Sequence, residues 1–159
     1  MVEVSFLPIL ASGIAAVIIS FIWFHPKVFG TYWMRASGIT PEAAERGKKR
    51  MPFMLVGGLL SAMLVAWVMN YVGIALGIYD WAGAVFDLAL WIWIGFIAPI
   101  LIGTVFWEGR PFRLFLVNAG YWLVVLVVMA LILLFGSNIA SGSYGTDTTE
   151  TAATVDSAE

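Results

Sequence analysis

A group of polar side chains lies at the ends of long apolar stretches, where arginine and histidine could form a basic pocket for an anionic headgroup or a small metabolite. Glu108 could act there as an acid or base, or as a carboxylate partner for Arg110. The simpler alternative is that these groups form ion pairs at a membrane interface and hold a turn, because polarity costs little at that depth. The members of this predicted polar cluster are His25, Arg35, Glu108, Arg110, Arg113 and Asn118.

A second set of candidate residues lies inside the apolar stretches. Asp87 is the only acid predicted within a span, so it suits a proton- or cation-coupled site, or else a helix N-terminus where the dipole favours a carboxylate. Asn118 either hydrogen-bonds across helices or lines a cavity, and two deep tryptophans either pack the bundle or stack on a flat ligand. The intramembrane candidates are Asn70, Asp87, Trp91, Trp93, Pro99 and Tyr121.

Metal and thiol chemistry find little support in the sequence. The chain has no cysteine, which excludes thiol catalysis and thiolate metal sites. His25 is its single histidine, and no second metal-ligating residue stands at a suitable spacing from it. We therefore predict neither a metal site nor a cofactor.

The elements that must position these residues are four apolar stretches. A hydrocarbon core about 30 Å thick requires about 20 apolar residues of helix. Hydrophobic residues make up 62% of the 159 residues and charged residues 11%, whereas soluble domains contain about 45–50% and about 25%. We predict an all-α membrane protein, a four-helix bundle over residues 1–135, with spans at 6–24, 53–74, 84–106 and 114–135.

Basic residues define the predicted orientation of this bundle. All eight Lys and Arg residues fall between the first and second stretches or between the third and fourth. Because cytoplasmic loops are enriched in Lys and Arg, both loops are predicted to be cytoplasmic and both termini external. The basic residues then set orientation and contact lipid headgroups, and nothing indicates nucleic-acid binding.

Local signals refine the connections. Thr40, Pro41 and Glu42 read as an N-cap, a proline at the first helical position and an acid in the first turn, which predicts a short cytoplasmic helix at 41–50. Pro99 predicts a kink in the third span, eased by Gly95 four residues earlier. Residues 136–159 are acidic and rich in Ser and Thr, so we predict a disordered external tail.

Small residues predict close helix packing. Ala11 and Ala15, Ser12 and Ala16 in the first span, and Gly57 and Ser61 in the second, are spaced so that a neighbouring helix can approach closely. These faces offer more packing surface than one small bundle needs, so we also expect a homo-oligomer.

Three segments carry a family resemblance: Phe21 to Met34, Trp93 to Phe96, and Phe106 to Tyr121. Together they resemble the bacterial membrane-protein family called domain of unknown function 1761, and the match extends through about residue 135. The resemblance implies a four-helix membrane protein and supplies no established activity. We predict that the protein lies in the bacterial inner membrane. Members often have Tyr-Ser-Pro where this chain has Phe24, His25 and Pro26, so the resemblance does not support His25 as a shared catalytic group.

Three classes of function remain open. The first is non-catalytic binding of lipid or of a protein partner, because no catalytic constellation is evident. The second is a small transporter or channel, supported by Asp87, Asn118 and the predicted kink at Pro99. The third is a membrane-embedded enzyme that acts on a lipid-soluble substrate through Glu108, with His25 as a second candidate group.

Overall fold

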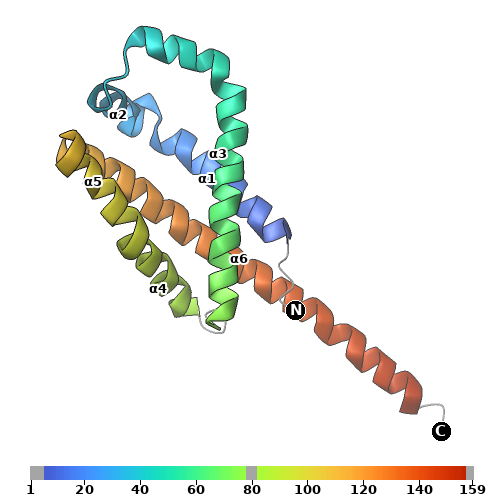
Figure 1. The fold of residues 1–159 in the computed structure, drawn as a ribbon. Helices are drawn as coiled ribbons and strands as arrows, with labels where there is room; N and C mark the ends of the chain where they lie inside the picture. Colours follow the sequence, from blue (N-terminus) through green and yellow to red (C-terminus); the bar gives the residue numbers. More distant parts are fainter. Residues whose placement is uncertain (1–5, 78–81, 157–159) are drawn as a thin grey trace.

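The computed structural model describes residues 6–77 and 82–156, which form helices joined by short connections (Figure 1). No strand occurs within these two ranges. The elements in chain order are α1 (Phe6–Trp23), the π-helical turn η1 (Pro26–Gly30), α2 (Thr31–Ala36), α3 (Pro41–Ala75), α4 (Ala82–Ile92), the π-helical turn η3 (Trp93–Ile97), α5 (Ala98–Glu108) and α6 (Phe112–Asp156).

Four helical segments in the described ranges are long and apolar enough to cross a membrane: Phe6–Trp23, Pro41–Ala75, Gly83–Glu108 and Phe112–Gly136. Their outward side chains are large and apolar, as with Phe53, which is 82% exposed, because lipid rather than water is the surrounding solvent. The predicted all-α, four-helix membrane fold is confirmed.

The first part of α3 differs in one respect from the prediction. The expected helix at 41–50 is present, but it continues without interruption into the second span through Pro52. Figure 1 shows that α3 changes direction in this region. Proline removes one backbone donor and crowds the carbonyl of Lys48, which bends a helix without necessarily ending it. The N-cap is as predicted, since the Thr40 hydroxyl accepts from the Ala43 N–H at 3.2 Å.

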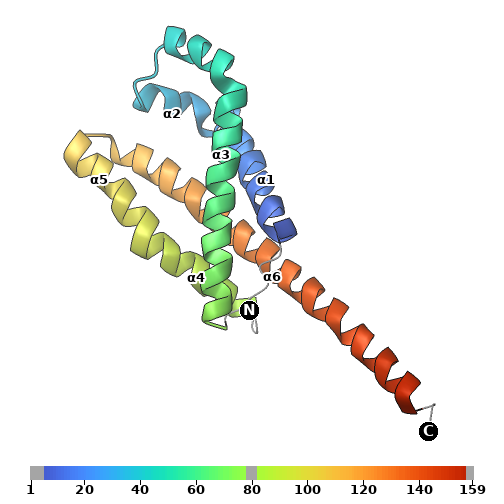
Figure 2. The ribbon, with the colours of Figure 1, turned by 45° about the vertical axis from the view of Figure 1, so that its right-hand side comes forward.

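The end of α6 also differs from the prediction. Helix continues to Asp156, where the sequence predicted disorder from residue 136 onward. An existing helix extends by one hydrogen bond per residue without a new nucleation step, which allows a polar segment to follow an apolar span. Figure 2 shows this part of α6 running well beyond the other helices.

The core lies where α6 crosses α1 and α4, and where α1 crosses α3. Ser12, Gly13 and Ala16 of α1 are buried there, as the small-residue spacing predicted. A Cβ on Gly13 would lie 2.7 Å from Met63 Cγ, so the two helices approach as closely as glycine allows. The largest fully buried apolar side chains among the described residues are Met69, Val85, Val125, Leu126, Met129 and Leu133.

The third span is divided by η3, which ends two residues before Pro99. The Ala98 N–H donates to the Trp93 carbonyl oxygen five residues earlier, which defines the π turn. Proline has no N–H, so it leaves one carbonyl of the preceding turn without its usual partner, and a π turn is one way to absorb the disruption. The predicted kink is therefore seen as a local change of helix type.

Candidate functional site

Two tryptophans fasten α1 and the third span to the same part of α6. Trp23 Nε1 donates to the Val117 carbonyl oxygen at 3.1 Å, and Trp93 Nε1 donates to the Ala119 carbonyl oxygen at 2.7 Å. A Cβ on Gly120 would lie 3.3 Å from Trp23 Cζ2, so the indole ring rests against α6 where that helix lacks a side chain. All three resembling segments meet at this point.

An aromatic cluster continues from this junction to α2. The Phe24 ring centroid lies 5.1 Å from that of Tyr121 on α6 and 5.2 Å from that of Trp33 on α2. Tilted aromatic pairs at such separations add to the stabilisation from buried area. The aromatic cluster holds α2 beside the C-terminal end of α1 and the N-terminal part of α6.

The hydrogen bonds that His25 accepts indicate a structural role in the turn after α1. Its Nδ1 accepts from the Lys27 N–H at 3.2 Å, and its carbonyl oxygen accepts from the Gly30 N–H at 3.0 Å. A Cβ on Gly30 would overlap the Phe24 carbonyl oxygen, so this turn requires glycine. His25 is exposed and caps η1.

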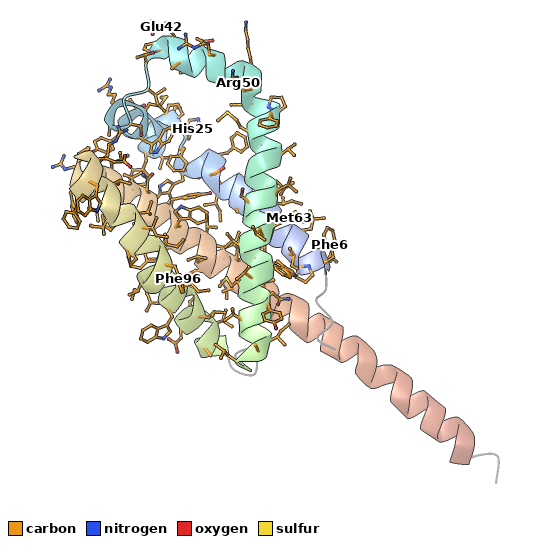
Figure 3. The ribbon with its side chains drawn as sticks, in the orientation of Figure 1. Phe6, His25, Glu42, Arg50, Met63 and Phe96 are labelled. Atoms are coloured by element: carbon orange, nitrogen blue, oxygen red, sulfur yellow. The ribbon has the colours of Figure 1, made fainter. Side chains whose placement is uncertain are left out.

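A groove of about 510 Å³ lies between the end of α1, α2 and the first half of α3. Figure 3 labels His25 after α1, and Glu42 and Arg50 on the part of α3 that arches over this region. Among the described residues that line the groove, Lys48 alone is charged. The lining residues are Ser20, Phe21, Phe24, Trp33, Met34, Ile39, Ala43, Ala44, Gly47, Lys48, Met51, Met54 and Leu55.

The predicted polar cluster is only partly assembled. Arg110 Nε lies 3.5 Å from Glu108 Oε2, and Arg110 Nη1 donates to the Ala36 carbonyl oxygen at the end of α2, also at 3.5 Å. These contacts join the two basic loops at one end of the bundle. Within the described chain, the side chains of Arg35 and Arg113 are exposed and form no hydrogen bond or ion pair.

The intramembrane candidates separate into two groups. Trp93 and Tyr121 contact the bundle interior, and Asn70 is buried at 7% exposure. Asp87 and Pro99 lie on the outer surface, as does Trp91 at 72% exposure. The side chain of Asn118 is half-buried without a hydrogen bond to a described residue, so the cross-helix bonds at this level come from the two indoles.

Sequence reasoning did not find the groove or the role of Trp23. Signals for both were present: three methionines lie in or directly after the first basic loop, at positions 34, 51 and 54, and an indole N–H within an apolar helix requires an acceptor. In the described ranges, no group of three or more His, Asp or Glu residues is arranged to hold a metal ion.

Comparison with known proteins supplies a family. The model described as "Protein of unknown function (DUF1761)" matches residues 7–134. The chain belongs to the DUF1761 family. The matched range includes the tryptophan junction, the groove and all four membrane-spanning segments up to Leu134. No curated protein and no solved structure matches this DUF1761 chain.

Proposed function

We propose that this membrane protein binds an amphiphilic lipid, without catalysis, in the groove between α1, α2 and α3. The observation that carries the proposal is the composition of the groove wall. Apolar side chains make up nearly all of it, and one lysine supplies the charge. A site of this kind accommodates an apolar chain and offers a single contact to a polar headgroup.

The size and adaptability of the groove support a lipid ligand. Its volume of about 510 Å³ lies within the range of about 300–1,000 Å³ that is usual for small-molecule sites. Met34, Met51 and Met54 line it, and methionine adjusts easily to flexible apolar ligands. The groove therefore suits an acyl or isoprenoid chain better than a rigid polar metabolite.

The position of the groove also supports a lipid. It joins the last residues of α1 to the part of α3 around Pro52, where apolar stretches give way to the basic loop. A headgroup would lie at this boundary and a chain would extend along the spans. We propose further that this end faces the cytoplasm of a bacterial inner membrane and that both termini are external, because all Lys and Arg residues lie at this end.

Photocrosslinking tests lipid binding directly. The protein would be placed in nanodiscs that contain phosphatidylglycerol with a diazirine on its acyl chain, and the cross-linked peptides mapped by mass spectrometry. We expect cross-links to concentrate in residues 20–24, 33–34 and 43–55. An even distribution over all four spans would contradict the proposal, because it would indicate bulk lipid alone.

Two substitutions on α3 provide a matched pair. A Cβ at Gly47 or at Gly58 meets nothing within 4 Å, so both positions accept a larger side chain. Gly47 lines the groove and Gly58 does not. Gly47→Leu should lower groove cross-linking to the level of the other spans, whereas Gly58→Leu should leave it unchanged.

Native mass spectrometry of the protein released gently from its membranes tests binding without a chosen probe. A stoichiometric bound species of defined mass is the expected result, and a bare protein or a spread of bulk lipids would oppose the proposal. The same spectrum reports subunit number. We propose a homo-oligomer, and Gly57 and Ser61 of α3 are exposed and available for such a contact.

A small transporter is the second candidate, supported by the π turn η3 in the middle of the third span. Proteoliposomes that contain a pH-sensitive dye would report proton flux driven by an imposed pH difference. A transporter that uses Asp87 should lose flux in Asp87→Asn, with stability retained. Equal leak in empty and protein-containing vesicles would remove proton transport from consideration.

A further inference from the structure

Lys48 stands at the boundary between the groove and the solvent-facing side of α3. It lines the groove, while its Nζ lies 2.6 Å from Glu45 Oε1. Glu45 is not among the lining residues. An ammonium has three donors, so an oxygen that approaches from the groove can share Lys48 with Glu45 or replace it.

Replacing Glu45 as the partner of Lys48 costs little free energy, because the ion pair is exposed. The side chains of Lys48 and Glu45 are 67% and 68% exposed. Ion pairs in such surroundings contribute little to stability, since water screens them and both side chains lose freedom. Glu45 is therefore a weak competitor for the lysine and does not block it.

The surrounding charge favours an anion over a zwitterion. The first part of α3 has four basic and two acidic side chains, which leaves an excess of positive charge. A positive surface attracts an anionic headgroup and repels the trimethylammonium of a choline headgroup. The charged residues of this segment are Glu42, Glu45, Arg46, Lys48, Lys49 and Arg50.

We infer that the groove selects amphiphiles whose apolar chain ends in an anion, that Lys48 contacts this anion, and that Glu45 lowers its affinity by competing for the same ammonium. The inference rests on the proposed function and adds the class of ligand and the residue that sets selectivity. A fatty-acid carboxylate and the phosphate of an anionic phospholipid share the required chemistry.

The experiment compares probes that differ only in headgroup. Free fatty acid, phosphatidylglycerol and phosphatidylcholine would each carry the same diazirine chain, in nanodiscs of unlabelled phosphatidylcholine. The quantity measured is the yield of cross-links within residues 43–55 at equal probe content. For one lysine contact near a membrane surface we expect the better anionic probe to exceed phosphatidylcholine by about fivefold. Which anionic probe gives more cross-links identifies the source of the anion.

Matched variants separate a specific contact from general attraction. Lys48→Gln and Lys49→Gln remove the same charge from neighbouring positions, but Lys49 does not line the groove. Lys48→Gln should lower the ratio strongly, Lys49→Gln should largely retain it, and Lys48→Arg should preserve it. Glu45→Gln should raise the yield of the anionic probe by about twofold, as expected for loss of a weak competitor.

The outcomes distinguish the two proposals. If cross-links map to the groove and disappear in Gly47→Leu, but Lys48→Gln keeps the headgroup ratio, the charge selectivity is wrong and lipid binding stands. If Lys48→Gln and Lys49→Gln change the headgroup ratio equally, the preference comes from the whole basic surface and the role of Lys48 is wrong. If no probe labels the groove above the other spans, both proposals fall.

Discussion

The indole N–H of Trp93 lies 2.7 Å from the carbonyl oxygen of Ala119, and this bond joins the π turn of the third span to α6. Two residues earlier on α6, Val117 accepts the indole N–H of Trp23. An indole N–H in hydrocarbon has no water to bond, so a backbone carbonyl of a neighbouring helix is a valuable acceptor. The bundle thus combines apolar packing with two directional bonds.

Loss of the Trp93 bond should weaken the bundle. Trp93→Phe keeps an aromatic ring but removes the donor, so we expect the free energy of unfolding to fall by about 1 kcal/mol. Trp91→Phe is the control, because Trp91 is 72% exposed on the same span. Thermal unfolding in detergent micelles would report both, and equal midpoints would show that the bond adds nothing.

The turn after α1 should tolerate no side chain at Gly30. In Gly30→Ala the new Cβ would overlap the Phe24 carbonyl oxygen, and we expect the free energy of unfolding to fall by about 3 kcal/mol or more. Gly58→Ala provides the comparison, since its Cβ meets nothing and alanine favours helix, which predicts a gain of about 0.5 kcal/mol. Denaturant titration of both variants checks the prediction, and a stable Gly30→Ala protein would contradict the geometry of η1.

The Glu108 carboxylate should matter little to stability. Its ion pair with Arg110 is 3.5 Å long and more than half of the Glu108 side chain is exposed, so Glu108→Gln should cost less than about 1 kcal/mol. The variant also addresses the enzyme hypothesis from the sequence. Cells that depend on the protein should grow normally with folded Glu108→Gln, and loss of growth without loss of folding would revive a chemical role.

The start of α3 should respond to acid through Glu42. Hydrogen bonds from its own backbone N–H and from the Thr40 hydroxyl lower the pKa of Glu42 from its ordinary value of 4.5. A lowered folded-state pKa means that the ionised carboxylate adds stability above about pH 4.5, and that this contribution is lost as pH falls through the folded value. Melting curves at pH 6 and pH 3 should differ less for Glu42→Gln than for the unmodified protein. If the shift in melting temperature between pH 6 and pH 3 were the same in both proteins, Glu42 would not contribute to the acid sensitivity.

The orientation can be tested with single cysteines, because the natural chain has none. Ser37→Cys lies in the first basic loop and Ser143→Cys in the C-terminal segment. In intact cells, a membrane-impermeant maleimide should label Ser143→Cys and leave Ser37→Cys unlabelled until the membrane is opened. The reverse pattern would place the basic end outside and overturn the predicted topology.

The sequence by itself determined the class of fold, because hydrocarbon imposes a length and a polarity on every segment that crosses it. All four spans were predictable on this basis, as were the Thr40 cap and the break before Pro99, since each depends on neighbours in the chain. The sequence predicted separate helices at 41–50 and 53–74, but the structure has one continuous helix through Pro52. A proline bends or ends a helix according to its surroundings, which the local sequence does not show.

Only the tertiary structure decided which polar and aromatic groups meet. Sequence distance concealed the pairing of Trp23 with Val117, and local composition did not show that Asn70 is buried while Asp87 is exposed. The groove was equally hidden, since α1, α2 and α3 each contribute one wall and no wall alone indicates a cavity. Contacts of this kind depend on helix rotation and crossing, which close packing selects and which local composition does not encode.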